Sequence, residues 1–183
     1  ELYLKSLQQK WVYILEDEAQ DSSKLQETIL RMLAGEGGNW VRVGDPNQAI
    51  FETFTTANPK YLRDFVNEEG VIGRELPNSG RSTRSIQKLA NYLIKWSLKH
   101  PHQAIRDRQP LTEPYIQPTP KGDPQPNPID NKCGVILHPE SFNPTQEALR
   151  VVDSIARWLP DHQDETVAIL VPRNTRGSEI VQL

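Results

Sequence analysis

Short apolar runs alternate with segments of helical periodicity along this chain, and that alternation restricts the folds open to it. Trp11–Leu15 and Trp40–Val43 combine β-branched, aromatic and aliphatic residues, as buried strands of a parallel sheet do. Between them, Ser23 and Gln26 fit a capping box, and apolar residues at helical spacing follow as far as Gly35. Further strands are expected at Val71–Leu76, Gly134–His138 and Thr166–Val171.

Helices are expected between these strands. They are predicted from Asn58-Pro59 to Val66, over about Thr83–Leu98 and Thr145–Leu159, and from Gly177 onward. The alternation favours an α/β fold with a mainly parallel sheet. Residues 101–132 differ, because they hold eight of the fifteen prolines and few apolar side chains. We expect an extended or polyproline-like excursion there, open to partial disorder.

The charge distribution suggests two parts. Residues 1–75 carry 8 Lys and Arg against 13 Asp and Glu, whereas residues 76–183 carry 13 against 11. Together with the loop from Pro77 to Gly80, this asymmetry predicts a boundary at roughly 70–80 between pieces of two sheets. Arg81–Lys99 has five basic residues and no acid, which fits either a solvated helix face or an element that faces phosphates.

Composition excludes several classes of protein. The mean hydropathy is −0.63, and no stretch approaches the roughly 18 consecutive apolar residues that a membrane helix needs. Cys133 is the only cysteine, so a disulfide scaffold and a cysteine-ligated metal are excluded, and a reducing, cytoplasmic compartment is expected. The chain begins at Glu1 and ends in a periodic apolar segment, and we expect it to be a fragment of a longer protein.

Polar residues follow the first two predicted strands, where parallel sheets bind ligands. Asp17 is a candidate Mg²⁺ ligand and Glu18 a candidate base for water that attacks a phosphate, although an acidic helix cap explains the cluster without a ligand. Gln48 is a candidate phosphate or water contact, within what is otherwise an Asp-Pro turn. Phe51 and Phe54 are suited either to stacking on bases or to a core.

These segments together resemble superfamily 1 helicases of the UvrD/Rep/PcrA type. The family's D-E-x-Q-D motif is matched by Asp17–Asp21, and its G-D-x-x-Q-S-I-[YF] motif by Gly44–Phe51, with Ala49 in place of serine. Its L-x-x-N-Y-R-S motif is matched at Leu76, Arg81 and Ser82, and its A-I-L-x-x-x-N segment at Ala168–Asn174. The motifs occur in the family's order over nearly the whole chain.

The resemblance implies a RecA-like, P-loop NTPase fold in three αβα layers, incomplete at both ends. Residues 1–75 would be the C-terminal part of a first motor domain and residues 76–183 the N-terminal part of a second. The implied activity is ATP-dependent unwinding of duplex DNA at junctions by a motor on single-stranded DNA, in a DNA-repair hydrolase that uses ATP and Mg²⁺.

The same resemblance implies residue roles. Asp17 would hold the metal of Mg-ATP, Glu18 would activate water, and Gln48 would sense the γ-phosphate. Arg81 would reach that phosphate from the second motor domain. The residues implied to bind DNA are Phe51, Phe54 and Asn174.

Departures from the family limit these implications. Gly80 stands where the family has an adenine-stacking tyrosine, and no Gly-Lys dipeptide exists to form a phosphate loop. We therefore expect the 183-residue chain to hydrolyse no ATP by itself. Two alternatives remain open: a catalytically inactive helicase-like scaffold that binds DNA, and a response-regulator receiver domain, a fold in which an acidic pair after the first strand binds Mg²⁺.

Overall fold

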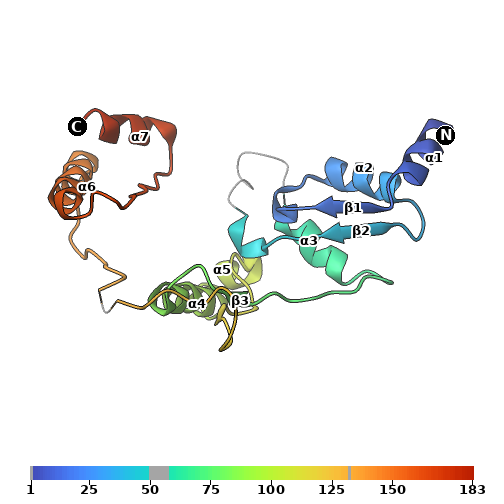
Figure 1. The fold of residues 1–183 in the computed structure, drawn as a ribbon, viewed down its shortest axis with the longest axis horizontal. Helices are drawn as coiled ribbons and strands as arrows, with labels where there is room; N and C mark the ends of the chain where they lie inside the picture. Colours follow the sequence, from blue (N-terminus) through green and yellow to red (C-terminus); the bar gives the residue numbers. More distant parts are fainter. Residues whose placement is uncertain (1, 50–57, 132) are drawn as a thin grey trace. The chain divides into compact units, whose positions relative to one another are not determined.

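The computed structural model describes residues 2–49, 58–131 and 133–183 (Figure 1). It divides into two compact units, Glu1–Val135 and Ile136–Leu183, and each is described by itself. The boundary between two motor-domain pieces near residues 75 and 76 stays a prediction.

A parallel two-stranded sheet organises the first part of the chain. Strand β1 (Tyr13–Glu16) pairs with β2 (Asn39–Arg42), so that Glu16 lies opposite Arg42. The strands are joined by helix α2 (Lys24–Ala34), which begins at the predicted Ser23–Gln26 capping box. It ends at Gly35, whose φ of 69° suits glycine. Helix α1 (Leu2–Lys10), which the sequence analysis did not predict, packs on α2.

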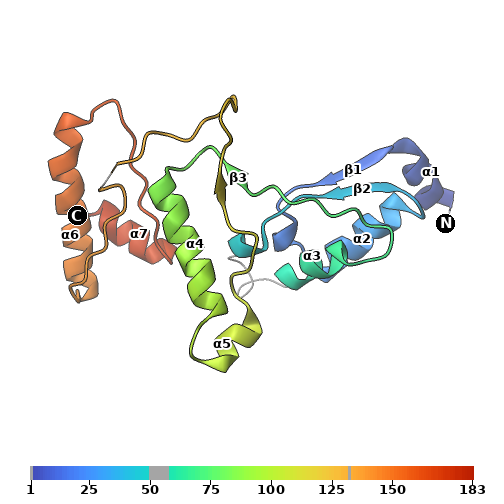
Figure 2. The ribbon, with the colours of Figure 1, turned by 90° about the horizontal axis from the view of Figure 1, so that it is seen from below.

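Helices α2 and α3 (Pro59–Val66) lie on the same side of this sheet (Figure 2). The side chains of Trp40 and Arg42 meet Phe65 of α3 there. The other side of the strands carries apolar side chains that are exposed among the described residues: Tyr13, Leu15, Val41 and Val43. The structure is therefore α/β with a parallel sheet, as predicted, and the three-layer RecA-like arrangement stays a prediction.

The later part of the first unit contains a second, very short parallel pair. Strand β3 (Asn78–Ser79) pairs with β4 (Gln117–Pro118), and helices α4 (Arg84–Leu98) and α5 (Gln103–Arg108) lie between them in the sequence. The strand predicted at Val71–Leu76 is wrong, because that segment is irregular and its Ile72 and Leu76 are 80% and 83% exposed. β-Branched composition alone does not form a strand when no neighbouring strand pairs with it.

The described part of the excursion, residues 101–131, is irregular apart from α5 and the two residues of β4, and side-chain amides hold its backbone. Asn91 of α4 both donates to and accepts from the backbone of Ile116, at 2.8 Å each way. Asn127 accepts a hydrogen bond from the backbone N–H of Thr119 and donates to the carbonyl oxygens of Ser79 and Ser82. The excursion is thus tied to α4 and to the loop that precedes it.

The second unit is built from helices and irregular segments. It contains α6 (Pro144–Trp158), the 3₁₀ turn η3 (Leu159–Asp161) and α7 (Asn174–Val181). The strands predicted at Gly134–His138 and Thr166–Val171 are wrong: both segments are irregular, with Leu137 and Leu170 about nine-tenths exposed. Among the residues that the structure describes, no helix has the length and apolar character to cross a membrane.

Candidate nucleotide site at the strand ends

The carboxyl ends of β1 and β2 bring the two predicted loops to one edge of the sheet. Pairing continues past the strands, because the N–H of Val43 donates to the Glu16 carbonyl at 2.8 Å and the N–H of Ala19 donates to the Val43 carbonyl at 2.9 Å. The chain then forms two 3₁₀ turns, η1 (Ala19–Asp21) and η2 (Pro46–Gln48). Asp17–Asp21 and Gly44–Gln48 are therefore spatial neighbours.

The acidic pair lies at the exposed end of β1. Asp17 and Glu18 are both exposed, and a side-chain oxygen of Asp17 accepts the N–H of Glu18 at 3.0 Å. Glu18 has a left-handed backbone with φ 51° and ψ 41°, which is uncommon for a residue with a side chain. This conformation turns the chain sharply between β1 and η1.

The buried amide of Gln20 joins the two loops. Its Nε2 donates to Glu18 Oε2 at 2.7 Å, and its Oε1 accepts the N–H of Asp45 at 3.0 Å. Glycine is required at position 44, because a Cβ there would lie 2.5 Å from Gln20 Oε1 and 2.9 Å from the nitrogen of Ala19.

The predicted amide of Gln48 belongs to the same network. Its Nε2 donates to Asp45 Oδ2 at 3.0 Å, while Asp45 Oδ1 caps η2 by accepting the N–H of Asn47 at 2.9 Å. An unbroken series of hydrogen bonds thus runs from Glu18 through Gln20 and Asp45 to Gln48. The structure brings these residues together at the sheet edge that the sequence predicted.

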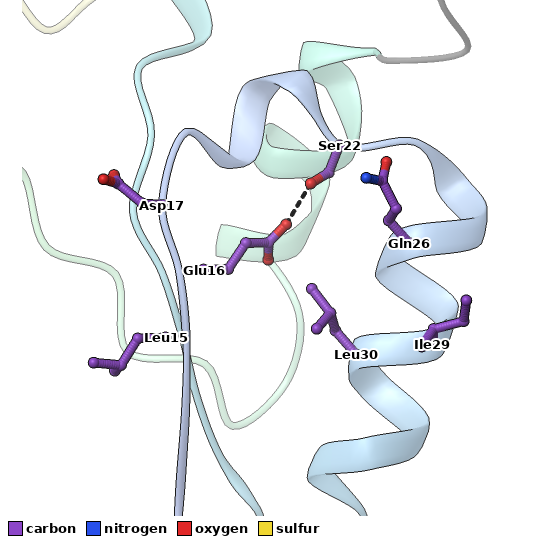
Figure 3. A pocket seen from close by; sticks show the side chains of 7 residues that line it. All are labelled: Leu15, Glu16, Asp17, Ser22, Gln26, Ile29 and Leu30. Atoms are coloured by element: carbon purple, nitrogen blue, oxygen red, sulfur yellow. Dashed lines mark hydrogen bonds between the residues drawn. The ribbon is translucent and has the colours of Figure 1, made fainter.

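A buried ion-pair cluster lies behind the acidic pair. Arg42, whose side chain is 1% exposed, contacts Glu16 at 2.7 Å and Glu27 at 3.4 Å. Ser22 donates to the other oxygen of Glu16 at 2.5 Å. Figure 3 shows Glu16 turned toward Ser22 and α2, and Asp17 on the other side of the strand. Both residues help to line a hollow of about 390 Å³, together with residues of α2.

Cations and aromatic rings complete the cluster. The Arg42 guanidinium lies 4.8 Å from the centre of the Trp40 ring and 4.9 Å from that of Phe65. Burial raises the pKa of Glu27, but hydrogen bonds and charge from Lys24, Arg31 and Arg42 outweigh it, so that this pKa lies below its ordinary value. Sequence reasoning missed the cluster; the one available signal was the charged residue at the end of each strand.

The other predicted site residues are not part of this network. Arg81 is exposed in the loop between β3 and α4, and no hydrogen bond or ion pair in the described part of the chain links it to Asp17, Glu18 or Gln48. Asn174 is exposed at the start of α7, in the second unit. The other predicted DNA-binding residues, Phe51 and Phe54, lie outside the described residues.

The structure explains why glycine occupies position 80. A Cβ on Gly80 would collide with the backbone carbonyl oxygen of Gln125, which comes from the proline-rich excursion. Gln87 and Asn127 hold the same loop by donating to the carbonyl oxygen of Ser79. The close approach of two backbone segments leaves no room for the tyrosine that the helicase motif has at this position.

The side chains at the strand ends fit a metal ion that takes most of its ligands from water and a bound phosphate and only one from the protein. In the described ranges, no three His, Cys, Asp or Glu side chains gather closely enough to form a metal cage. Asp17 is an exposed carboxylate, the ligand type that Mg²⁺ prefers, and Mg²⁺ commonly binds through one or two carboxylates together with water and substrate phosphates.

Comparison with known proteins points to one family. Residues 1–69 match the UvrD/REP helicase N-terminal domain family. Over 180 residues the chain is 28% identical to the ATP-dependent DNA helicase UvrD2 of Mycobacterium tuberculosis (strain H37Rv). The matched segment covers 97% of this chain and 23% of that protein.

Two other relatives match about half of the chain, and both are described as DNA helicase II. The chain is 34% identical over 93 residues to the protein of Haemophilus influenzae, covering 51% of this chain and 13% of that protein. It is 33% identical over 93 residues to the protein of Escherichia coli (strain K12), covering 50% of this chain and 13% of that protein. The chain therefore spans less than a quarter of the length of each of these three relatives.

Proposed function

We propose that this chain is part of a superfamily 1 ATP-dependent DNA helicase, in which it supplies metal-binding and water-activating residues of the ATPase site. The observation that carries the proposal is the hydrogen-bonded series from Glu18 to Gln48 at the ends of two paired parallel strands. Both loops lie within the segment that matches the UvrD/REP family. The complete protein would couple Mg-ATP hydrolysis to movement on single-stranded DNA and to duplex unwinding.

Each residue of the network has a chemical role in this proposal. Asp17 ligates Mg²⁺, which neutralises charge on the phosphates when it is bound. Glu18 accepts the proton of the attacking water, and its exposure leaves it accessible to that water. Gln48 offers an amide at the same edge, where a change in its contacts reaches Asp45 directly and Gln20 through Asp45.

The remaining roles rest on motif positions. We propose that Arg81 stabilises charge on the γ-phosphate when the site closes, and that Phe51, Phe54 and Asn174 contact single-stranded DNA. The backbone cradle for the triphosphate is not among these 183 residues, which contain no Gly-Lys dipeptide. Activity is therefore assigned to the longer protein that would contain this chain.

The proposal is tested by the metal dependence of ATP turnover in that longer protein. Asp17→Asn removes the carboxylate with little change in shape, so we expect ATPase stimulated by single-stranded DNA to need a higher Mg²⁺ concentration and to fall about 10²-fold or more. Asp64→Asn makes the same chemical change at an exposed position of α3 and is expected to behave as wild type. An unchanged Mg²⁺ dependence in Asp17→Asn would remove Asp17 from the metal site, and a complete absence of ATPase in the wild type would favour the inactive DNA-binding scaffold.

A further inference from the structure

Gln20 combines deep burial with two hydrogen bonds to different loops. The residue is 2% exposed, and its amide touches the side chain of Glu18 on one side and the backbone of Asp45 on the other. We propose that Gln20 is a positioning residue, which holds the Glu18 carboxylate in the orientation needed to take a proton from water. The proposal rests on the role proposed above for Glu18.

The two partners fix which way the amide points. The Asp45 N–H can only donate, so it requires the oxygen of Gln20, and the Glu18 carboxylate can only accept, so it requires the nitrogen. A rotated amide would lose both hydrogen bonds inside a buried site, at the cost of leaving polar groups without partners. Gln20 therefore presents its N–H to Glu18 as a rigid donor.

That donor determines which oxygen of Glu18 faces water. The 2.7 Å contact engages Oε2 in a hydrogen bond to a charged acceptor, which is stronger than one between neutral groups. Within residues 2–49, 58–131 and 133–183, no other hydrogen bond engages the second oxygen, Oε1, and we propose that this oxygen accepts the proton. Because Glu18 is exposed and is itself the left-handed residue between β1 and η1, its side chain would have many orientations without this contact.

Gly44 and Asp45 extend the effect of Gln20 to the other loop. A side chain at position 44 would displace the Gln20 amide, since its Cβ would lie 2.5 Å from Oε1. Asp45 also accepts a hydrogen bond from the Gln48 side chain at 3.0 Å. A shift of the Gln48 loop therefore moves the Asp45 N–H and, through Gln20, the carboxylate of Glu18.

A double-mutant cycle in the longer, active protein separates positioning from general destabilisation. Gln20→Met keeps the length of the side chain and removes its polar atoms, and we expect kcat to fall about 10–100-fold with little change in KM for ATP. In a Glu18→Gln background the same change should lower kcat further by less than about threefold, because its effect passes through Glu18. Asn91→Leu, which removes a similar two-sided amide bridge on α4, should lower kcat equally in both backgrounds or not at all.

A second readout is independent of activity. Hydrogen exchange at the Asp45 amide should be about tenfold faster in Gln20→Met, the equivalent of one lost hydrogen bond, and unchanged in Gln20→Glu, which keeps an acceptor oxygen. Gln20→Glu should still lose turnover, because it sets a second carboxylate against Glu18. If Gln20→Met does not fold, Gln20→Glu takes its place as the test of the positioning role. Equal losses in both Glu18 backgrounds, or normal turnover in Gln20→Met, would overturn the positioning role alone. Normal turnover in Glu18→Gln would overturn the proposed function and the Gln20 role together.

Discussion

At the scale of single residues, the first layer beneath the candidate site is ionic rather than apolar. Arg42 lies between Glu16 and Glu27, with all three side chains no more than 7% exposed. Removing one member of a buried pair is costly, about 3–5 kcal/mol, because it leaves the other charge without compensation. The cluster fixes the ends of β1 and β2 just before Asp17 and Gly44, and so holds the two loops in register.

Glu27 gives this cluster a defined pH dependence. Its pKa in the folded chain lies below the ordinary value of 4.5, so the unfolded chain binds this proton at a higher pH than the folded one. The stability that Glu27 contributes is therefore fully present above about pH 4.5 and is lost as the pH falls through the lower, folded value. Because Arg42 keeps its ion pair with Glu16 in Glu27→Gln, we expect this change to cost less than the loss of a sole partner: about 1.5–3 kcal/mol of unfolding free energy at pH 7, with the gap to wild type shrinking in acid.

Urea unfolding of the chain between pH 7 and pH 3, followed by tryptophan fluorescence, measures that gap. Glu36→Gln makes the same substitution at an exposed residue and should stay close to wild type at every pH. A gap for Glu27→Gln that stays constant or widens in acid would show that the ion pairs do not lower this pKa.

At the scale of elements, the proline-rich excursion is tied to the candidate site. Asn47 of η2 donates to the carbonyl oxygen of Thr112 at 2.8 Å and accepts its N–H at 2.7 Å. This pair of hydrogen bonds joins residues far apart in the chain and places Thr112, inside the excursion, against the loop that carries Gln48. The loop is thus held from both sides, by Thr112 and by Gln20.

We expect Asn47→Ala to release this part of the excursion. The loss of two hydrogen bonds, at about 0.5–1.5 kcal/mol each, should raise the open population roughly tenfold and speed proteolytic cleavage within residues 109–120 accordingly. Gln8→Ala, which breaks a side-chain link to the carbonyl oxygen of Met32 elsewhere in the unit, is the matched control. Cleavage at the same rate in Asn47→Ala and wild type would mean that the Thr112 contact does not order the excursion.

Local signals explain which elements the sequence predicts correctly. The capping box at Ser23, the Asn58-Pro59 helix start and the glycine that ends α2 act within a few residues, and all three are confirmed. The strands expected at Val71–Leu76 and Thr166–Val171 fail because a strand depends on a paired neighbour, which an apolar run does not reveal. The Arg42 cluster was missed for a similar reason, since Glu16 and Glu27 meet Arg42 only through the fold.

At the scale of the whole molecule, the candidate site occupies one edge of one small sheet. Its parallel strands place Asp17, Glu18 and Gln48 on that edge, as their positions after the two predicted strands indicated, and the buried Gln20 connects Glu18 to the loop of Gln48. Arg81, Asn174 and the two phenylalanines remain predictions, because their roles depend on how separate parts of a longer protein close around ATP and DNA. The chain covers at most 23% of the length of each of the three relatives described above.

The most direct test is ATP turnover by Glu18→Gln in the longer protein that would contain this chain. The change keeps the size of the side chain and removes the base, so ATP binding should remain while turnover stimulated by single-stranded DNA falls about 10²–10⁴-fold. Glu36→Gln, the same substitution at an exposed position between glycines, should retain wild-type turnover. Turnover by Glu18→Gln close to that of wild type would contradict the assignment of these strand ends as the catalytic half of an ATPase site.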